Sequence, residues 1–234
     1  MNKVKRAIIM AAGKGTRMYP LTIDTPKPLI KVNGKRMIET IIDTLIEKGI
    51  KEIYVVVGYL KEKFEVLNKY KEVTIIENPY YDICNNISSL YVARDYIEDA
   101  FILDGDQIIY NKDILNLDFE KSGYSCIYTS QHTDEWVLNV EDGIVTSCSV
   151  GGENGYQLFS LSRWNKEDGE RLKKHLELEF DIKKNRQIYW DDVALFCHPE
   201  DYQLGIYEIK HGDLIEIDNY SELLEIDSSY KEVK

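Results

Sequence analysis

The fold is decided near the amino terminus, by the stretch Ala7-Ile8-Ile9-Met10-Ala11-Ala12-Gly13-Lys14-Gly15-Thr16-Arg17. The apolar run over residues 7–10 predicts a buried strand, and the glycines that follow predict a tight loop. Because glycine has no side chain, the backbone N–H groups of such a loop can come close to phosphate oxygens. The spacing matches neither the P-loop nor the dinucleotide fingerprint. Taken alone, the loop fits a phosphate site and an ordinary tight turn equally well.

Short apolar runs alternate with helical periodicity through the first half of the chain, which predicts βαβ units. We expect further strands at 53–57, 73–76 and 100–103, and helices at 37–48, 61–70 and 86–97. From residue 124 onward the pattern favours antiparallel strands at 125–129, 136–140 and 144–147, with Asp142-Gly143 as a hairpin signal. Helices at 166–177 and 220–225 and strands at 207–209 and 214–217 follow.

These elements predict one α/β domain over residues 1–234, with no internal repeat or linker that would mark a boundary. The expected architecture is a doubly wound, Rossmann-like, mostly parallel sheet with a small antiparallel lobe.

Composition excludes several classes of protein. The net charge of −12 argues against a nucleic-acid partner, because phosphate backbones require clustered Lys and Arg. No apolar run is long enough to cross a bilayer, so we expect no membrane insertion. The four cysteines are dispersed without a CxxC pair, which favours reduced thiols in a cytoplasmic protein. The sequence does not determine the oligomeric state.

Carboxylates after a second strand indicate a metal site. Asp104 and Asp106 follow the strand at 100–103, and ligands of doubly wound sheets bind outside the carboxyl ends of the strands. An aspartate there can hold Mg²⁺ against a phosphate, or merely cap the next turn. Near the carboxyl terminus, strand alternation places Glu216 and Asp218 on one face, so both can point into the same site.

The opening motif, followed by Thr25 and Pro26-Lys27-Pro28, resembles the signature of the nucleotidyltransferases that activate sugar phosphates and related compounds. The resemblance implies a GT-A-like fold, in which Arg17 and Lys27 contact the nucleotide phosphates or the attacking phosphate. It further implies that Asp106 and Asp218 bind Mg²⁺. Nucleotide contacts would come from Asp104 and from the signature loop, through Ala11, Ala12, Gly13, Lys14, Gly15 and Thr16.

Aromatic side chains beside carboxylates suggest the acceptor. The pairs are Glu135-Trp136 and, further on, Tyr189-Trp190-Asp191-Asp192. A quaternary ammonium group offers no N–H donor, so it requires aromatic faces and nearby negative charge. Each segment by itself also fits a core or rim position with a solvated acid beside it.

With the Asn-Asn-x-x-Ser-Leu-Tyr segment at 85–91 and the terminal Glu-Ile-Asp, the chain resembles the bacterial CTP:phosphocholine cytidylyltransferases along nearly its whole length. The resemblance implies transfer of CMP from CTP to phosphocholine, giving CDP-choline and pyrophosphate. The acceptor would then be bound by Asn86, Ser89, Trp136, Tyr189, Trp190, Asp192 and Glu216.

Three alternatives stay open at this point. The 2-aminoethylphosphonate cytidylyltransferases share most of these motifs. A hexose-1-phosphate nucleotidyltransferase fits the opening motif, although the short chain and the Trp and Asp pairs argue against it. An inactive nucleotide-binding regulatory protein would not need the complete set of Arg17, Lys27, Asp106 and Asp218.

Overall fold

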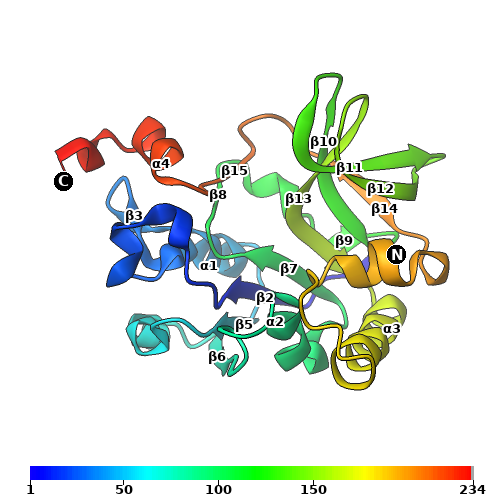
Figure 1. Cartoon of the computed structure of the whole chain (residues 1–234), viewed down its shortest axis with the longest axis horizontal. Coiled ribbons are helices and arrows are strands. Elements are labelled where there is room, and N and C mark those ends of the chain that lie inside the picture. The colour runs from blue at the N-terminus through cyan, green and yellow to red at the C-terminus, as the bar shows by residue number, and fades with distance from the viewer. Residues whose placement is uncertain (233–234) are drawn as a thin grey trace.

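The computed structural model describes residues 1–232, and a mixed nine-stranded sheet runs through it (Figure 1). The strand order is β10-β14-β12-β11-β13-β7-β2-β5-β6, with β10 also paired to β13. The strands are β2 (Arg6–Ala11), β5 (Glu52–Val57), β6 (Val73–Glu77), β7 (Ala100–Asp104), β10 (Gly123–Thr129), β11 (Thr133–Glu141), β12 (Ile144–Gly152), β13 (Gly155–Trp164) and β14 (Gly205–Glu208).

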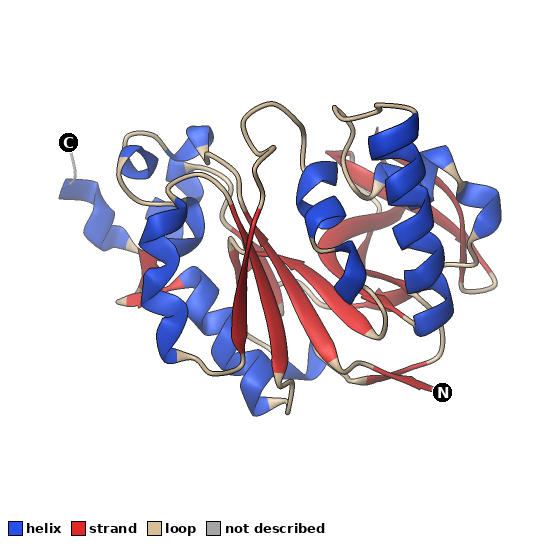
Figure 2. Ribbon diagram, turned by 90° about the horizontal axis from the view of Figure 1, so that it is seen from below, coloured by secondary structure: helices blue, strands red, loops and turns tan. Residues whose placement is uncertain are grey.

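Strand β2 shows why the sheet carries helices on both faces. Its side chains alternate, so Ala7 and Ile9 join one core cluster and Ile8 and Met10 join the other. The first cluster contains residues of α1 (Met37–Glu47), and the second contains residues of α2 (Ile87–Val92) and α3 (Lys166–Glu177). Figure 2 shows helices on either side of the strands. A strand buried on both faces reads as a continuous apolar run, as residues 7–10 do.

The parallel strands lie in the spatial order β7-β2-β5-β6, whereas along the chain β2 comes first and β7 last. The connections therefore run in opposite directions from β2, and the carboxyl ends of β2 and β7 flank the point where the direction switches. A crevice forms at such a point. The signature loop follows β2 there, and Gly105, just after β7, donates its N–H to the Met10 carbonyl oxygen at 2.9 Å.

The antiparallel strands belong to the same sheet, through β13. This strand is the longest of the molecule's described part, pairs with β7, β10 and β11, and was absent from the sequence prediction. Its register against β10 shifts, so that Tyr124 faces Ser162 while Ser125 faces Phe159. Ser160 and Leu161 therefore form a bulge, which interrupts the alternation that a sequence pattern relies on.

The α/β class, the parallel half and the antiparallel additions are confirmed, and the remaining differences are local. The expected helix at 61–70 consists of 3₁₀ turns over Lys61–Lys69, where the apolar Phe64 and Leu67 are three residues apart, as that geometry requires. The helix expected at 86–97 ends at Val92 and continues as a 3₁₀ turn over Arg94–Tyr96. Helix α4 (Tyr220–Ile226) lies as expected.

Three short two-stranded sheets complete the architecture. They pair β1 (Asn2–Lys3) with β9 (Asp118–Phe119), β3 (Lys31–Val32) with β4 (Lys35–Arg36), and β8 (Gln107–Ile109) with β15 (Leu214–Glu216). The last pair carries the chain back across the crevice from the antiparallel side. Within residues 1–232 we find no helix with the length and apolar character needed to span a bilayer.

Candidate active site

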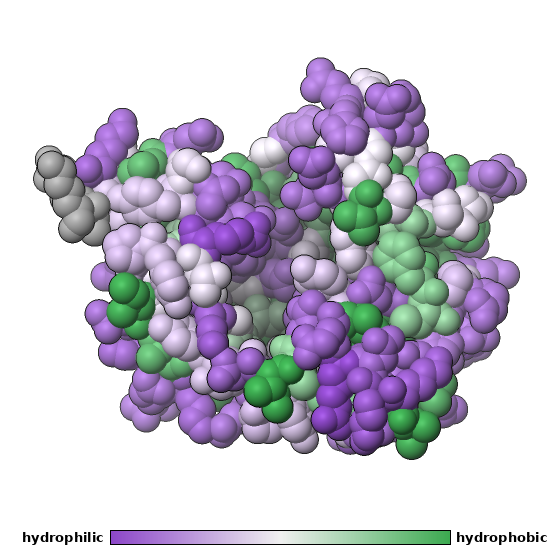
Figure 3. Space-filling model, viewed as in Figure 1, coloured by the Kyte–Doolittle hydropathy of each residue, from purple (hydrophilic) through white to green (hydrophobic). Residues whose placement is uncertain are grey.

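The crevice holds two adjoining cavities of about 280 Å³ each, and the surface is hollowed at the middle of the view in Figure 3. The first, which we call the loop pocket, is lined by the signature loop together with Lys27, Asn86 and Ser89. The second, the acidic pocket, is lined by Glu135, Trp136, Ser160, Tyr189, Asp191 and Glu216. Residues lining both cavities are Arg17, Asn86, Asp104, Asp106 and Asp218. A molecule bound in one cavity would therefore meet a molecule bound in the other at these side chains.

The signature loop is shaped by a close approach to Lys27. Gly15 has a φ of 62°, and a Cβ atom built on it would lie 2.9 Å from the Cβ of Lys27. Only glycine accepts both conditions without strain. The hydroxyl of Thr22 donates to the Gly15 carbonyl oxygen at 2.8 Å, which ties the loop to the turn that leads to Lys27.

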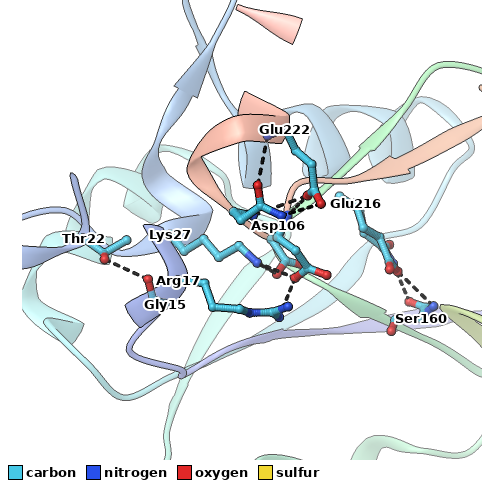
Figure 4. Close-up of polar contacts among 11 residues, drawn as sticks. Gly15, Arg17, Thr22, Lys27, Asp106, Ser160, Glu216 and Glu222 are labelled. Atoms are coloured by element: carbon cyan, nitrogen blue, oxygen red, sulfur yellow. Dashed lines mark hydrogen bonds and ion pairs between the residues drawn. The ribbon is translucent and has the colours of Figure 1, made fainter. Parts of the chain in front are cut away.

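Two cations and two carboxylates meet at the junction of the cavities (Figure 4). The Lys27 Nζ atom lies 2.5 Å from Asp106 Oδ2 and 3.0 Å from Asp218 Oδ1, and the Arg17 guanidinium donates to the same Asp218 oxygen at 2.7 Å. Burial alone lowers the pKa of Lys27, but the charges of Asp106 and Asp218 outweigh this effect, so that its pKa is raised. The ammonium group therefore stays charged. The structure brings together the four residues that the sequence predicted at this place.

A helix cap positions Asp218. Asn219 is the N-cap of α4, and its side-chain oxygen accepts the backbone N–H of Glu222, whose carboxylate in turn accepts the N–H of Asn219. The same Glu222 carboxylate also accepts the backbone N–H of Asp218 at 2.6 Å. This capping box therefore holds the Asp218 backbone as well as the start of the helix.

The acidic pocket contains three carboxyl groups that are partly buried, those of Asp104, Asp191 and Glu216. Burial, together with the charges of Asp106 and Glu216, raises the pKa of Asp104 well above its usual range. Burial and the charge of Asp106 raise the pKa of Glu216 to about 7, and burial raises that of Asp191 to about 8. Near neutral pH these carboxyl groups therefore retain protons, and a bound cation would favour their ionised forms.

The bulge in β13 orients Glu216. The Glu216 Oε1 atom accepts the Ser160 N–H at 3.1 Å and the Gln107 side-chain N–H at 2.8 Å. Gln107 also donates to the Ser160 carbonyl oxygen at 2.9 Å. Because Ser160 lies in the bulge, these backbone groups are available to side chains in the crevice.

Two of the predicted acceptor residues lie elsewhere. Trp190 is 3% exposed and packs in the core against Trp164 and Tyr124, because its side chain points opposite to those of its neighbours. Asp192 accepts the backbone N–H of Tyr189 at 2.6 Å and closes a local turn. The carboxylate that lines the acidic pocket is instead its neighbour Asp191. The two adjacent aspartates gave no sequence signal that distinguishes them.

The other predicted residues are placed as follows. Trp136 and Tyr189 line the acidic pocket with ring centroids 5.7 Å apart, in an edge-to-face arrangement. Asn86 accepts the Trp190 N–H at 2.8 Å and thereby joins α2 to the segment that carries Asp191. Lys14, in contrast, extends out of the loop and forms an ion pair with Asp82, because the crevice side of the loop is its backbone. The loop pocket is lined by the residues predicted to contact the nucleotide, Ala11, Ala12, Gly13, Gly15, Thr16 and Asp104. Glu216, predicted to bind the acceptor, lines the acidic pocket, whereas Ser89, also predicted to bind the acceptor, lines the loop pocket.

The charges of the site fit a bound divalent cation. Six carboxyl groups, from Asp104, Asp106, Glu135, Asp191, Glu216 and Asp218, share the crevice with the two cations Arg17 and Lys27. Magnesium prefers oxygen ligands and is commonly bound by one or two carboxylates plus substrate phosphates. Asp106 and Asp218 are the pair that approaches a common point, because both contact the same nitrogen atom of Lys27.

Comparison with known proteins agrees with this site. The family model described as nucleotidyl transferase matches residues 6–129, the half that contains the signature loop and Asp106. The chain belongs to the nucleotidyltransferase family, a class of enzymes.

Among the relatives that match nearly the whole chain are two cytidylyltransferases with different acceptors in their names. The 2-aminoethylphosphonate cytidylyltransferase of Lancefieldella rimae is 40% identical over 96% of this chain and 92% of its own length. The choline-phosphate cytidylyltransferase of Streptococcus pneumoniae is 31% identical, over 97% of this chain and 98% of the relative. A solved structure of CTP:phosphocholine cytidylyltransferase from S. pneumoniae superposes with a TM-score of 0.90 and 31% identity, covering 97% and 99% of the two chains. The predicted nucleotidyltransferase fold is thereby confirmed.

Proposed function

We propose that this enzyme transfers CMP from CTP to a small phosphorylated or phosphonylated amine and releases pyrophosphate. The observation that carries the proposal is the junction of the two cavities. There, Arg17, Lys27, Asp106 and Asp218 lie between a loop suited to phosphates and a pocket suited to an ammonium group. The choice of CTP rests on the two cytidylyltransferase relatives.

The residues of the chain would act by position and charge. The loop backbone and Arg17 would bind the triphosphate in the loop pocket, and Asp106 and Asp218 would hold Mg²⁺. When bound, the metal ion supplies positive charge to the phosphate oxygens. An oxygen of the acceptor's phosphoryl group would attack the α-phosphorus in line, forming one P–O bond while the bond to the bridging oxygen of pyrophosphate breaks. Lys27 would stabilise the negative charge of the leaving group, and the reaction needs no side-chain nucleophile.

The acidic pocket favours a primary ammonium group, and hence 2-aminoethylphosphonate. A primary ammonium donates three hydrogen bonds, and the pocket offers oxygen acceptors on Asp104, Asp191, Glu216 and Ser160. Binding such a cation would favour the ionised forms of these carboxyl groups. The aromatic lining, in contrast, is restricted to Trp136 and Tyr189, since Trp190 lies in the core.

Phosphocholine is the second candidate acceptor. Its trimethylammonium group can stack on an aromatic face, and Trp136 and Tyr189 stand at right angles, as two walls of a corner. The similarity to the pneumococcal choline-phosphate cytidylyltransferase also supports it.

The test is pyrophosphate release with CTP, ATP, GTP and UTP, each crossed with 2-aminoethylphosphonate, phosphocholine, phosphoethanolamine and glucose 1-phosphate in the presence of Mg²⁺. We expect turnover with CTP only, and the largest kcat/KM with 2-aminoethylphosphonate. A larger value with phosphocholine would select the second candidate. Turnover with glucose 1-phosphate, or none with any pair, would refute the proposal. Asp106→Asn serves as the inactive control, because it removes one carboxylate from the metal site.

A further inference from the structure

The Lys27 ammonium group occupies the space between the two carboxylates assigned to the metal. Its side chain is 9% exposed, and the Nζ atom contacts Asp106 Oδ2 at 2.5 Å and Asp218 Oδ1 at 3.0 Å. The partners are 79 and 191 residues away along the chain. A single nitrogen atom thus links the end of β7 to the segment before α4.

A lysine and a magnesium ion would compete for the same carboxylate oxygens. Magnesium binds oxygen ligands at about 2.1 Å, so an ion on these atoms would lie within about 5 Å of the ammonium group. Like charges at this separation repel each other, and burial of the Lys27 side chain reduces the screening of its charge by water. Asp218 Oδ1 carries a further positive neighbour in Arg17, at 2.7 Å.

The loop pocket offers a second position for the Lys27 ammonium group. Lys27 lines the loop pocket, its backbone begins a 3₁₀ turn over Lys27–Leu29, and its side chain has four flexible carbons beyond the Cα atom. The triphosphate proposed for that pocket would offer phosphate oxygens in exchange for the carboxylates.

We propose that Lys27 is a built-in counter-ion that holds Asp106 and Asp218 together in the free enzyme and leaves them for the nucleotide when magnesium binds. The inference rests on the proposed function, which assigns both carboxylates to the metal. Metal and nucleotide binding then become cooperative. The metal ion takes the place of Lys27 on the two carboxylates, and the nucleotide phosphates bind the displaced ammonium group. Free metal should therefore bind weakly to the native protein, since it must compete with Lys27.

The experiment measures Mn²⁺ binding without nucleotide or acceptor, by the electron paramagnetic resonance signal of free Mn²⁺. Lys27→Met keeps an unbranched side chain that is one atom shorter and removes its charge. We expect this variant to bind Mn²⁺ about tenfold more tightly than the native enzyme, since a competing cation is gone. Its melting temperature, lowered by the unpaired carboxylates, should rise more on addition of MgCl₂ than that of the native enzyme.

Two controls locate the effect. Lys5→Met removes a lysine that is paired with Asp99 at 2.7 Å outside the crevice, and should leave Mn²⁺ affinity unchanged. Asp106→Asn in the Lys27→Met background should cancel the gain. If Lys27→Met folds and binds Mn²⁺ no more tightly than the native enzyme, the counter-ion role is wrong. If it does not fold, Lys27→Ala is measured in its place, with the same two outcomes.

Failure of this inference and failure of the proposed function can be told apart. The Mn²⁺ titration contains no substrate, so tighter binding by Lys27→Met stands even if no acceptor is turned over. Conversely, native turnover of 2-aminoethylphosphonate with unchanged Mn²⁺ affinity in Lys27→Met would leave the function intact and remove only the counter-ion role.

Discussion

Replacing Asp191 by Asn should stabilise the free enzyme, and by an amount that grows with pH. The pKa of Asp191 is raised from 3.8 to about 8, first by burial. The folded protein therefore retains a proton that the unfolded chain releases, and the native protein loses stability as pH rises from about 4 to about 8. Each pKa unit corresponds to about 1.4 kcal/mol. The loss is then about 2 kcal/mol at pH 5.5 and about 5 kcal/mol at pH 8.

The assay is urea unfolding of native enzyme and Asp191→Asn at pH 5.5 and pH 8, without substrates. The unfolding free energy of the variant minus that of the native enzyme should be about 3 kcal/mol larger at pH 8 than at pH 5.5. Comparing the two pH values removes any constant effect of the new side chain. Asp113→Asn is the control for the substitution itself, because the Asp113 side chain is 91% exposed and pairs with Lys48 outside the crevice. An Asp191→Asn difference that is equal at both pH values, or smaller at pH 8, would refute the reasoning.

Three further substitutions test other parts of the structure. Lys27→Ala should lower kcat by two orders of magnitude or more, which is the order expected when charge stabilisation is lost. The rate is measured by single-turnover kinetics, and a native rate would contradict this role. Trp136→Ala should raise the KM for the amine acceptor by about tenfold, the size of a desolvated cation–π contact, and leave the KM for CTP unchanged; an effect on CTP alone would count against the pocket assignment. Gly123→Ala should abolish soluble expression or lower the melting temperature sharply, since the new Cβ would lie 2.0 Å from the Gly205 carbonyl oxygen. A melting temperature like that of the native enzyme would contradict this close contact between the two strands.

The sequence predicted those elements whose burial follows one simple period. The run at 7–10 is buried on both faces of the sheet, and the helix predicted at 166–177 is α3 itself. Strand β13 was missed because its bulge at Ser160 and Leu161 changes which side chains face inward partway along the strand. The 3₁₀ turns over Lys61–Lys69 were predicted as a helix, since i and i+3 contacts occur in both geometries.

The part of the candidate site that could be predicted consists of charged residues whose type the chemistry requires and whose place near the ends of strands the sequence shows. Arg17, Lys27, Asp106 and Asp218 converge because the topology places the ends of β2 and β7 side by side and brings β15 back to them. The choice between Asp191 and Asp192 could not be made in this way. Adjacent residues in a turn point in different directions, and only the packing of Trp190 between Trp164 and Tyr124 fixes which carboxylate faces the crevice.

The pairing of β15 with β8 has a consequence for biosynthesis. A ribosome delivers the amino-terminal part first, so a nascent chain that ends in β13 already contains the signature loop, Lys27 and Asp106. Glu216 and Asp218 emerge only after β13 and β14 have been made. Until then Lys27 has one carboxylate partner in place of two, and the crevice lacks one of its walls. The protein can therefore bind its substrates only late in synthesis, when the newly made β15 pairs with β8, which was made earlier.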